Sequence, residues 1–248
     1  MEKLLQLSFN TGQIASAIQV QQITELPQAV ATMGLQMARP TLVIVGGASK
    51  MCAADFLQIQ RLFMEVLAPI AENLGAYVVD GGTDAGVMRL MGEARTEIGA
   101  KFALIGVAPA SKVALPNCLE PPADSTPLEP NHNYFVLVPG SNWGDESPWL
   151  AALATVLANG APSLTILING GEITFQDALQ NVNAERLVIV LAGSGRTADI
   201  LANALHGESS DQRAIELAKS GIVHYIELSS FQESFEQLAQ MIKGLLSA

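Results

Sequence analysis

Short apolar runs that recur along the chain predict buried strands. Leu187–Ala192 consists of six apolar residues, rich in branched side chains, and is bounded by Arg186 and Gly193. This pattern is typical of a central strand that is covered on both faces. The other segments predicted as strands are Leu4–Phe9, Ala17–Gln21, Thr41–Val45, Ala76–Asp80, Phe102–Ala108, Tyr134–Val138, Leu164–Ile168 and Ile222–Leu228.

Between these runs, apolar positions recur at the spacing of an amphipathic helix. Phe56, Ile59 and Phe63 begin one such series, which ends at Asn73 before Gly75. An earlier helix ends before Pro40, because proline cannot continue a helix. In addition to the helix that ends at Asn73, we predict helices at Leu26–Met37, Val87–Ile98, Asp145–Asn159, Thr174–Asn183, Thr197–His206, Asp211–Ser220 and Phe231–Leu246.

The regular alternation of strand and helix predicts an α/β fold, with a mostly parallel sheet and helices on both faces. No Gly/Ser linker or shift in composition interrupts it, so we predict a single domain over residues 1–248. Within it we distinguish amino-terminal strands and a helix (1–40), a core that carries the motifs (41–205) and a helix–strand–helix end (206–248). The irregular segment 109–131 is rich in proline, and such loops are typical of functional lids or partner contacts.

Glycine turns follow several predicted strands directly. They begin at Gly46, Gly81, Gly140, Gly170 and Gly193. In a parallel sheet the carboxyl ends of the strands meet at one edge, and ligands bind there where the strand order reverses. We therefore expect several of these turns to converge on one site.

The turn Gly193-Ser194-Gly195-Arg196 lies between a strand and a helix. Unpaired backbone N–H groups at such a turn attract anions, and an arginine adds a bidentate donor. The alternative is a tight turn capped by Ser194, with Arg196 paired to Asp199 on the next helical turn. The turn alone does not decide between these two interpretations.

Composition and charge restrict the choice of ligand. The formal net charge is −11, only 15% of the residues are charged, and no Lys/Arg cluster exists, so we expect no nucleic-acid partner. No apolar run reaches the ~18 to 20 residues of a membrane span, and the amino terminus lacks a signal-peptide pattern. We expect a cytoplasmic protein without membrane contact. Cys52 and Cys118 stand outside any CxxC or His/Cys cluster, which predicts neither a disulfide framework nor a metal site.

Taken in order, the motifs resemble those of a known family. They are GGASK, YVVDGGTDAGVMRLMGEA, LIGVAP, LEPNHNYFVLVPGSNWGDE, ILINGG and VLAGSGRTADILA. This series resembles the amino-terminal cytosolic region of TRPM (melastatin) channels, a member of the Rossmann-like SLOG superfamily that also contains the LOG-type phosphoribohydrolases. The resemblance covers residues 41–205. The chain resembles a free-standing, prokaryotic version of that module.

The resemblance implies a ligand that is a nucleotide or a nucleotide derivative, such as ADP-ribose. It gives no certain cofactor. By position in the motifs, it implies ligand contacts at Gly46, Gly47, Gly81, Gly82, Thr83, Gly86, Asn131, His132, Gly140, Ser141, Trp143, Gly144, Glu146, Gly193, Ser194, Gly195 and Arg196. Trp143 stands where the channels have tyrosine, a position suited to stacking on a base or ribose.

Two departures from the family patterns bear on catalysis. The channels carry an arginine in the helix after the acid that Glu146 matches, whereas this helix has none. The LOG-type hydrolases carry an Arg-Lys pair where this chain has Asn131-His132-Asn133. Their chemistry needs a carboxylate near the ribose, and Glu146 or Asp145 is the candidate here.

Several single residues keep a structural alternative. Arg89 reaches a phosphate or pairs with Glu93, and Asp84 contacts a ribose or caps the helix at Ala85. His132 is more often structural at such a position, and Lys50 is a candidate phosphate contact or a solvated lysine. Trp143 and Trp149 line the pocket or pack at an interface.

The sequence thus supports two functions from different classes. The first is a binding or sensing module for a small phosphorylated metabolite, in an expected homo-oligomer. The second is a hydrolase that cleaves an N-glycosidic bond of a nucleotide. A purely structural oligomer with empty turns is a third, weaker hypothesis.

Overall fold

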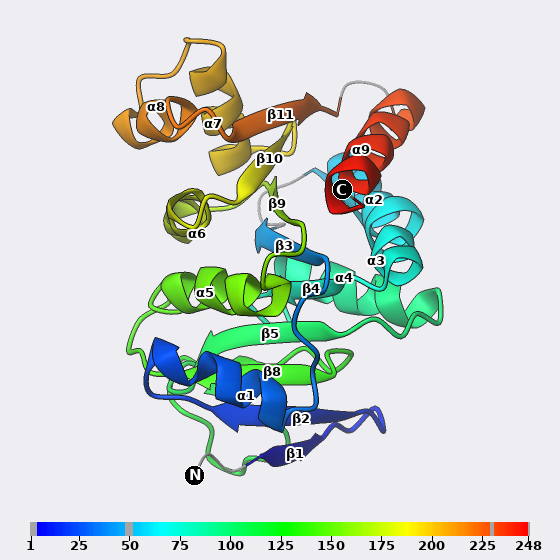
Figure 1. Cartoon of the computed structure of the whole chain (residues 1–248), viewed down its shortest axis with the longest axis vertical. Helices are drawn as coiled ribbons and strands as arrows, with labels where there is room; N and C mark the ends of the chain where they lie inside the picture. The colour runs from blue at the N-terminus through cyan, green and yellow to red at the C-terminus, as the bar shows by residue number, and fades with distance from the viewer. Residues whose placement is uncertain (1–3, 48–51, 229–230, 248) are drawn as a thin grey trace.

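The computed structural model describes residues 4–47, 52–228 and 231–247. In this part of the chain a nine-stranded sheet has the order β1-β2-β8-β5-β4-β3-β9-β10-β11 (Figure 1). β1 and β2 pair antiparallel, and all other neighbours pair parallel. The strands are β1 (Leu5–Ser8), β2 (Ile14–Gln19), β3 (Thr41–Gly46), β4 (Tyr77–Asp80), β5 (Leu104–Pro109), β8 (Tyr134–Val138), β9 (Ser163–Ile168), β10 (Leu187–Ala192) and β11 (Val223–Glu227).

Helices cover both faces of this sheet. One face carries α1 (Leu26–Thr32), α5 (Ser147–Ala158), α6 (Glu172–Asn183), α7 (Arg196–Leu205) and α8 (Gln212–Ala218). The other carries α2 (Ala53–Leu62), α3 (Ala68–Leu74), α4 (Gly86–Glu97) and α9 (Phe231–Leu246). In the described residues, no helix combines the length and apolar character needed to cross a membrane.

Alternation along the central strand explains the two layers. Successive side chains of a strand point to opposite faces. Val43 and Val45 of β3 pack into the core beneath α5 and α6, whereas Leu42 and Ile44 pack into the core beneath α2 to α4. The predicted doubly covered α/β sheet is therefore confirmed, and its apolar runs are the strands that both helix layers bury.

The path of the chain creates a switch point beside β3. After β3 the chain forms β4, β5 and β8 on one side, and then returns to form β9, β10 and β11 on the other (Figure 1). The connections that leave β3 and β9 therefore run to opposite faces of the sheet. A crevice at the carboxyl ends of these two strands is the expected ligand position in such folds.

Some elements differ from the sequence prediction for local reasons. α1 ends at Thr32 and not at Met37, because Gly34 adopts a left-handed φ of 73°. The long helix before Gly75 is interrupted by a π-helical turn at Phe63–Leu67, just before Pro69, whose missing N–H disturbs the regular hydrogen-bond ladder. A 3₁₀ turn at Ile23–Glu25 precedes α1.

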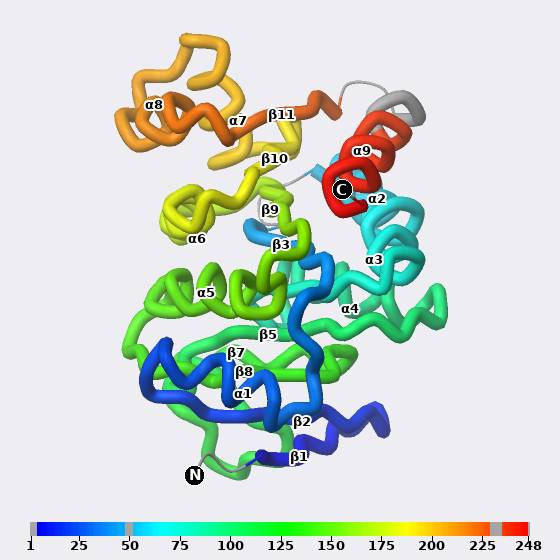
Figure 2. The backbone as a smooth tube through the Cα atoms, in the orientation of Figure 1, coloured from blue at the N-terminus to red at the C-terminus, as the bar shows by residue number. Residues whose placement is uncertain are grey.

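The segment 109–131 is partly ordered against the sheet. It contains a short parallel pair, β6 (Val113–Ala114) with β7 (Thr126–Pro127), of which β7 is labelled in Figure 2. The amide of Asp84 donates to Pro127 O at 2.8 Å, and Thr83 forms a bridge with Leu128. This segment therefore holds the turn that follows β4.

That turn also lies directly on β5. A Cβ atom added at Gly106 would be 2.5 Å from Gly82 Cα and 2.8 Å from the Phe135 ring. Gly82 itself has a φ of 66°, a conformation that favours glycine. Two glycines thus allow the turn to approach the sheet closely enough to form one wall of the crevice.

We predict that Gly106→Ala destabilises the protein by about 1 to 3 kcal/mol, because the methyl group overpacks a backbone contact. Urea unfolding measures this change. Gly244→Ala is the matched control, since a Cβ there meets nothing within 4 Å and alanine favours a helix. Equal unfolding midpoints for Gly106→Ala and the wild type would contradict the close contact.

Candidate functional site

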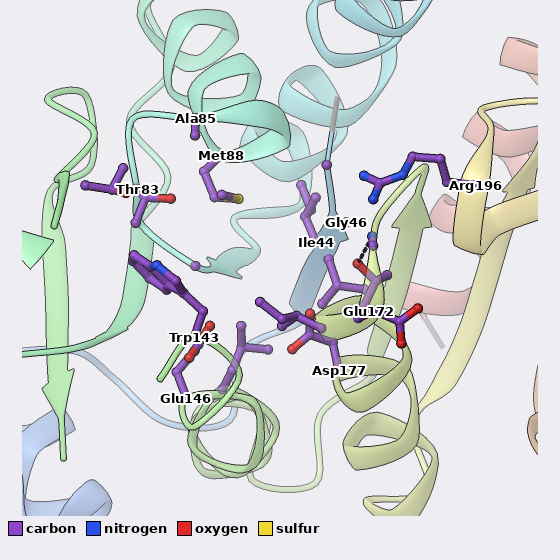
Figure 3. Close-up of a pocket in the computed structure, with 18 residues that line it drawn as sticks. Ile44, Gly46, Thr83, Ala85, Met88, Trp143, Glu146, Glu172, Asp177 and Arg196 are labelled. Atoms are coloured by element: carbon purple, nitrogen blue, oxygen red, sulfur yellow. Dashed lines mark hydrogen bonds between the residues drawn. The ribbon is translucent and has the colours of Figure 1, made fainter. Parts of the chain in front are cut away.

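A cavity of about 440 Å³ opens at the carboxyl edge of the sheet, beside the switch point. Its size falls in the range of ~300 to 1,000 Å³ that is usual for small-molecule sites. The ends of β3 and β4 form one side, the first residues of α6 and Arg196 form another, and Trp143 and Glu146 close the third (Figure 3). Elements from both halves of the sheet therefore contribute to one cavity.

The structure brings together part of the set expected from the sequence. The expected residues that line the cavity are Gly46, Gly47, Gly81, Thr83, Trp143, Glu146 and Arg196. Gly46 has a φ of 129° and lies so close to Ile168 that a Cβ would overlap the Ile168 carbonyl group. Only glycine allows β3 and β9 to remain paired up to the edge of the cavity.

Other expected residues lie outside the cavity lining. They are Gly82, Gly86, Asn131, His132, Gly140, Ser141, Gly144, Gly193, Ser194 and Gly195. Gly86 lines an adjoining hollow of about 630 Å³ together with Arg89, which pairs with Asp84 at 2.6 Å and not with Glu93. Asp84 therefore does not cap the helix at Ala85. Trp149 belongs to α5 and is buried in the core between this helix and the sheet. Lys50 lies outside the described residues.

At three of the five glycine turns, amides that we expected to hold an anion donate to the chain's own carboxylates. Asp199 Oδ1 accepts from the amides of Gly193 and Gly195 at 2.7 and 3.1 Å. Asp145 Oδ2 accepts from Ser141 and Asn142 at 2.8 and 3.0 Å.

Two further amides show the same arrangement, one in the Gly81 turn and one in the Gly140 turn. Asp80 Oδ1 accepts from the amide of Gly82 at 2.8 Å, and Glu146 Oε2 accepts from the amide of Gly144 at 2.7 Å. These carboxylates accept the amide hydrogen bonds that we expected an anionic ligand to accept. The amide groups of these turns therefore stabilise the turns themselves.

Arg196 reaches the cavity from the start of α7, even though the rest of its turn does not. Ser194 is buried, and its hydroxyl donates to Leu191 O at 2.6 Å and accepts from the amide of Asn169 at 2.8 Å. Asn169 also donates from Nδ2 to Ser194 O at 2.7 Å. These bonds join the ends of β9 and β10 and fix the position from which the Arg196 side chain extends.

The Arg196 backbone has a left-handed φ of 55°, which is uncommon for a residue with a side chain. Its guanidinium lies over Gly171, since a Cβ added there would be 2.9 Å from Nη2. Gly171 precedes α6, where the Thr174 amide donates to Gly171 O at 3.0 Å and the Gly171 amide donates to Thr174 Oγ1 at 3.1 Å, so the Glu172 and Ile173 amides remain at the helix start. The guanidinium and the helix terminus thus place positive charge at the same side of the cavity.

This helix terminus is a part of the site that the sequence prediction did not include. Gly171, Glu172, Ile173 and Thr174 all line the cavity. The Gly170-Gly171 turn was recognisable as one of the glycine turns, but its motif did not single it out as a contact. Strand order supplies the missing information, because β9 is the neighbour of β3.

Two buried carboxylates lie at another part of the cavity. Glu146 precedes α5 and Asp177 lies within α6, and they are 8% and 9% exposed. Burial raises the pKa of Asp177 to about 7; a hydrogen bond from Ser147 opposes this shift, and the charge of Glu146 adds to it. Burial likewise raises the pKa of Glu146. The other catalytic candidate, Asp145, does not line the cavity, and amide hydrogen bonds from Asn142 and Ser141 lower its pKa.

Asp177 was not predicted from the sequence. It shares the buried face of α6 with Thr174, Ala178 and Asn181. An acid on the buried face of a predicted helix is the signal that would have identified it, because such an acid must be paired or face a cavity. Throughout the described residues, no group of three His, Cys, Asp or Glu side chains is arranged to hold a metal ion.

His132 and Asn131 belong to a buried network behind the cavity. His132 Nε2 lies 2.8 Å from Asp80 Oδ1, and its Nδ1 lies 2.7 Å from Glu129 Oε2. Glu129 also accepts from Asn131, at 2.9 Å from the amide and 2.6 Å from the side chain. Because both ring nitrogens face carboxylates, only the doubly protonated imidazolium donates to both.

This network holds the wall formed by the Gly81-Gly82 turn. Asp80 Oδ1 binds both the Gly82 amide and His132, and Glu129 N donates to Gly82 O at 3.0 Å. Asp80 Oδ2 is buried and has no hydrogen-bond partner in the described part of the chain. His132 therefore acts as a structural cation between two acids, as its structural alternative anticipated.

We predict that stability falls with rising pH because of His132. Burial lowers the pKa of this residue, but the charge of Asp80 and the hydrogen bonds to Asp80 and Glu129 raise it to about 9, above its ordinary 6.5. The folded state therefore binds the extra proton between these values. The contribution of His132 to the free energy of unfolding is complete below about pH 6.5 and is lost as the pH rises through 9. The free energy of unfolding falls over this range by at most about 1.4 kcal/mol per pH unit.

Urea unfolding at several pH values between 6 and 10 measures this dependence. His132→Gln should lower stability near pH 6 by about 3 to 5 kcal/mol, because it leaves buried charges uncompensated, and should flatten the slope. His224→Gln, at an exposed position on β11, should retain the wild-type slope. An unchanged slope in His132→Gln would exclude the buried imidazolium.

The fold and the cavity define a doubly wound, Rossmann-like α/β protein with a small-molecule site at its switch point. The model of the family described as "SLOG in TRPM, prokaryote" matches residues 39–237. The chain belongs to this family, as the sequence motifs predicted.

Similar curated proteins are TRPM channels. The mouse transient receptor potential cation channel subfamily M member 2 is 24% identical over 204 residues, which cover 68% of this chain. The related channel protein of Nematostella vectensis is 28% identical and that of Drosophila melanogaster is 25% identical, covering 65% and 86% of this chain. The alignments span only 12 to 13% of these relatives.

One solved structure resembles the fold over most of both chains. The crystal structure of the structural genomics target TM1055 aligns with a TM-score of 0.53 and 20% sequence identity. The alignment covers 81% of this chain and 99% of that one. This likeness supports the architecture of the sheet and its helices.

Proposed function

We propose that the cavity at the switch point binds a small phosphorylated metabolite, namely a nucleotide or a nucleotide derivative such as ADP-ribose. The chain then acts as a binding or sensing module in a homo-oligomer. The observation that carries this proposal is the position of Arg196, whose guanidinium lies over Gly171 at the amino terminus of α6. A guanidinium and a helix terminus together are complementary to phosphate.

Trp143 supports the part of the ligand that is not phosphate. It lines the cavity from the loop between β8 and α5, on the side of Thr83 and away from Arg196 (Figure 3). An indole ring at such a position stacks on the flat face of a nucleobase. The volume of about 440 Å³ is compatible with a nucleotide held between these two features.

The net charge of the chain restricts how this ligand is held. Because the overall charge is −11, a phosphate has no favourable general field and depends on local donors. At the Gly81, Gly140 and Gly193 turns, carboxylates of the chain already accept hydrogen bonds from the amides. Arg196 and the α6 terminus are therefore the phosphate contacts that we propose.

We predict that AMP, ATP, NAD, ADP-ribose or cyclic ADP-ribose raises the melting temperature, because a ligand that binds the folded state stabilises it by mass action. Arg196→Gln should weaken the affinity of the stabilising nucleotide at least about tenfold in isothermal titration calorimetry, since a charge-assisted contact to phosphate is worth roughly 1.5 to 3 kcal/mol. Size-exclusion chromatography with light scattering then reports whether that nucleotide changes the oligomeric state.

Arg61→Gln is the matched control. Arg61 pairs with Glu65 at 2.7 Å on the surface of α2, where both side chains are about half exposed. The Arg61→Gln substitution removes one positive charge, as Arg196→Gln does, but lies outside the cavity lining. Failure of every nucleotide in the panel to stabilise the wild type at millimolar concentration would reject the proposed ligand class.

The second candidate function is hydrolysis of a nucleotide N-glycosidic bond, and the specific observation in its favour is Glu146. This carboxylate lines the cavity, and burial raises its pKa. A carboxylate near the ribose stabilises the positive charge that develops as such a bond breaks. Glu146 is the residue to which we assign this role.

For this second function we predict release of free base from a nucleoside monophosphate or an NAD derivative, detected by chromatography. Glu146→Gln should lower the rate at least about a hundredfold, because it removes electrostatic stabilisation of the transition state. Asp145→Asn is the matched control, since Asp145 binds the Ser141 and Asn142 amides outside the cavity lining. An equal rate in Glu146→Gln and the wild type would remove Glu146 from the mechanism, and no release by the wild type would reject the hydrolase.

A further inference from the structure

The cavity contains a polar group that phosphate binding does not use. Asp177 is only 9% exposed and lines the cavity from the second turn of α6. Its Oδ1 atom accepts from the Ser147 hydroxyl at 2.6 Å, which fixes the orientation of the carboxyl group. Its Oδ2 atom forms no hydrogen bond within the described residues, and since it is not among the fully buried atoms there that lack a partner, it is accessible from the cavity.

The surroundings of Asp177 restrict what can pair with Oδ2. Glu146 lines the same cavity and raises the pKa of Asp177 through its charge. Because burial raises the pKa of Asp177 to about 7, its carboxyl group exists in both protonation states near neutral pH. Such a group both donates and accepts hydrogen bonds, and the negative charge of Glu146 repels a further anion.

Hydroxyl groups match this chemistry, because each donates one hydrogen bond and accepts others. A phosphate oxygen does not match it, since its negative charge faces two acids. The described part of the chain also places no third carboxylate, cysteine or histidine with these two as a metal-ligand group. The complementary group is therefore a neutral polyol, such as the hydroxyl-bearing face of a sugar.

The position of Asp177 relative to Arg196 agrees with one ligand that reaches both. The guanidinium lies over Gly171, and α6 advances about 9 Å from Gly171 to Asp177, at about 1.5 Å per residue. The Arg196 and Asp177 side chains both line the cavity, at the two ends of this span. A phosphate attached to a five-carbon sugar has a suitable length to contact both.

We propose that Asp177, together with Glu146, binds the sugar hydroxyl groups of the phosphorylated ligand, so that the cavity selects ribose over 2′-deoxyribose. This inference rests on the proposed function, because it assumes that a phosphorylated ligand occupies the cavity. Ser147 is the positioning residue for Asp177, and Arg196 contributes affinity without sugar selectivity.

Isothermal titration calorimetry with AMP and 2′-deoxy-AMP tests the proposal. The wild type should bind AMP at least about tenfold more tightly, because the lost hydroxyl leaves a buried carboxylate unpaired. Asp177→Ala should bring the affinity ratio close to one. Arg196→Gln should weaken both nucleotides by a similar factor and leave the ratio unchanged.

Glu172→Gln is the matched control on the same helix and cavity. Glu172 is exposed and pairs with Arg213, so its charge lies outside the buried pair. It should preserve the ratio. Asp177→Asn provides a variant of nearly equal shape if Asp177→Ala does not fold, and it should lower the ratio without lowering the melting temperature, since it relieves a buried charge.

The outcomes separate the two proposals. Equal binding of AMP and 2′-deoxy-AMP by the wild type overturns the sugar contact and leaves the proposed function intact. An undiminished ratio in folded Asp177→Ala or Asp177→Asn overturns the role of Asp177. No binding of either nucleotide by the wild type overturns the proposed function and this inference with it.

Discussion

The hydrogen bonds between acidic side chains and the amides of glycine turns determine the character of this sheet edge. Asp80, Asp145, Glu146 and Asp199 each accept from backbone N–H groups at the carboxyl end of a strand. These bonds stabilise turns whose backbone would otherwise be poorly satisfied. They also neutralise the positive potential of the turns, and this leaves Arg196 and the start of α6 as the region suited to an anion.

The same edge depends on a second layer of interactions behind it. His132 joins Asp80, at the end of β4, to Glu129, in the segment that leads to β8. Gly92 of α4 packs so closely on the Glu129 carboxylate that it has no room for a side chain. The imidazole ring therefore connects the strand end to the loop behind the cavity wall, and α4 packs directly on the Glu129 carboxylate that this ring binds.

The sequence predicted the fold well because the relevant signals are local. Branched apolar runs such as Leu187–Ala192 and Tyr134–Val138 became strands with those bounds, and the glycine turns marked the edge where the cavity lies. The site was predicted less completely. The capture of the Gly193 amide by Asp199 depends on a turn conformation, and the burial of Asp177 depends on the packing of α6 against α5, which no local pattern encodes. The placement of Gly171 beside Arg196 likewise required the strand order.

The left-handed backbone at Arg196 has a consequence for how this module diversifies. A residue with a Cβ atom has a higher conformational energy than glycine at a φ of 55°, so glycine at this position would stabilise the folded protein. Family members under no pressure to retain a guanidinium at this place should drift toward glycine. The identity of this one residue would then separate relatives that hold an anion from those that have kept only the scaffold, without a structure of each.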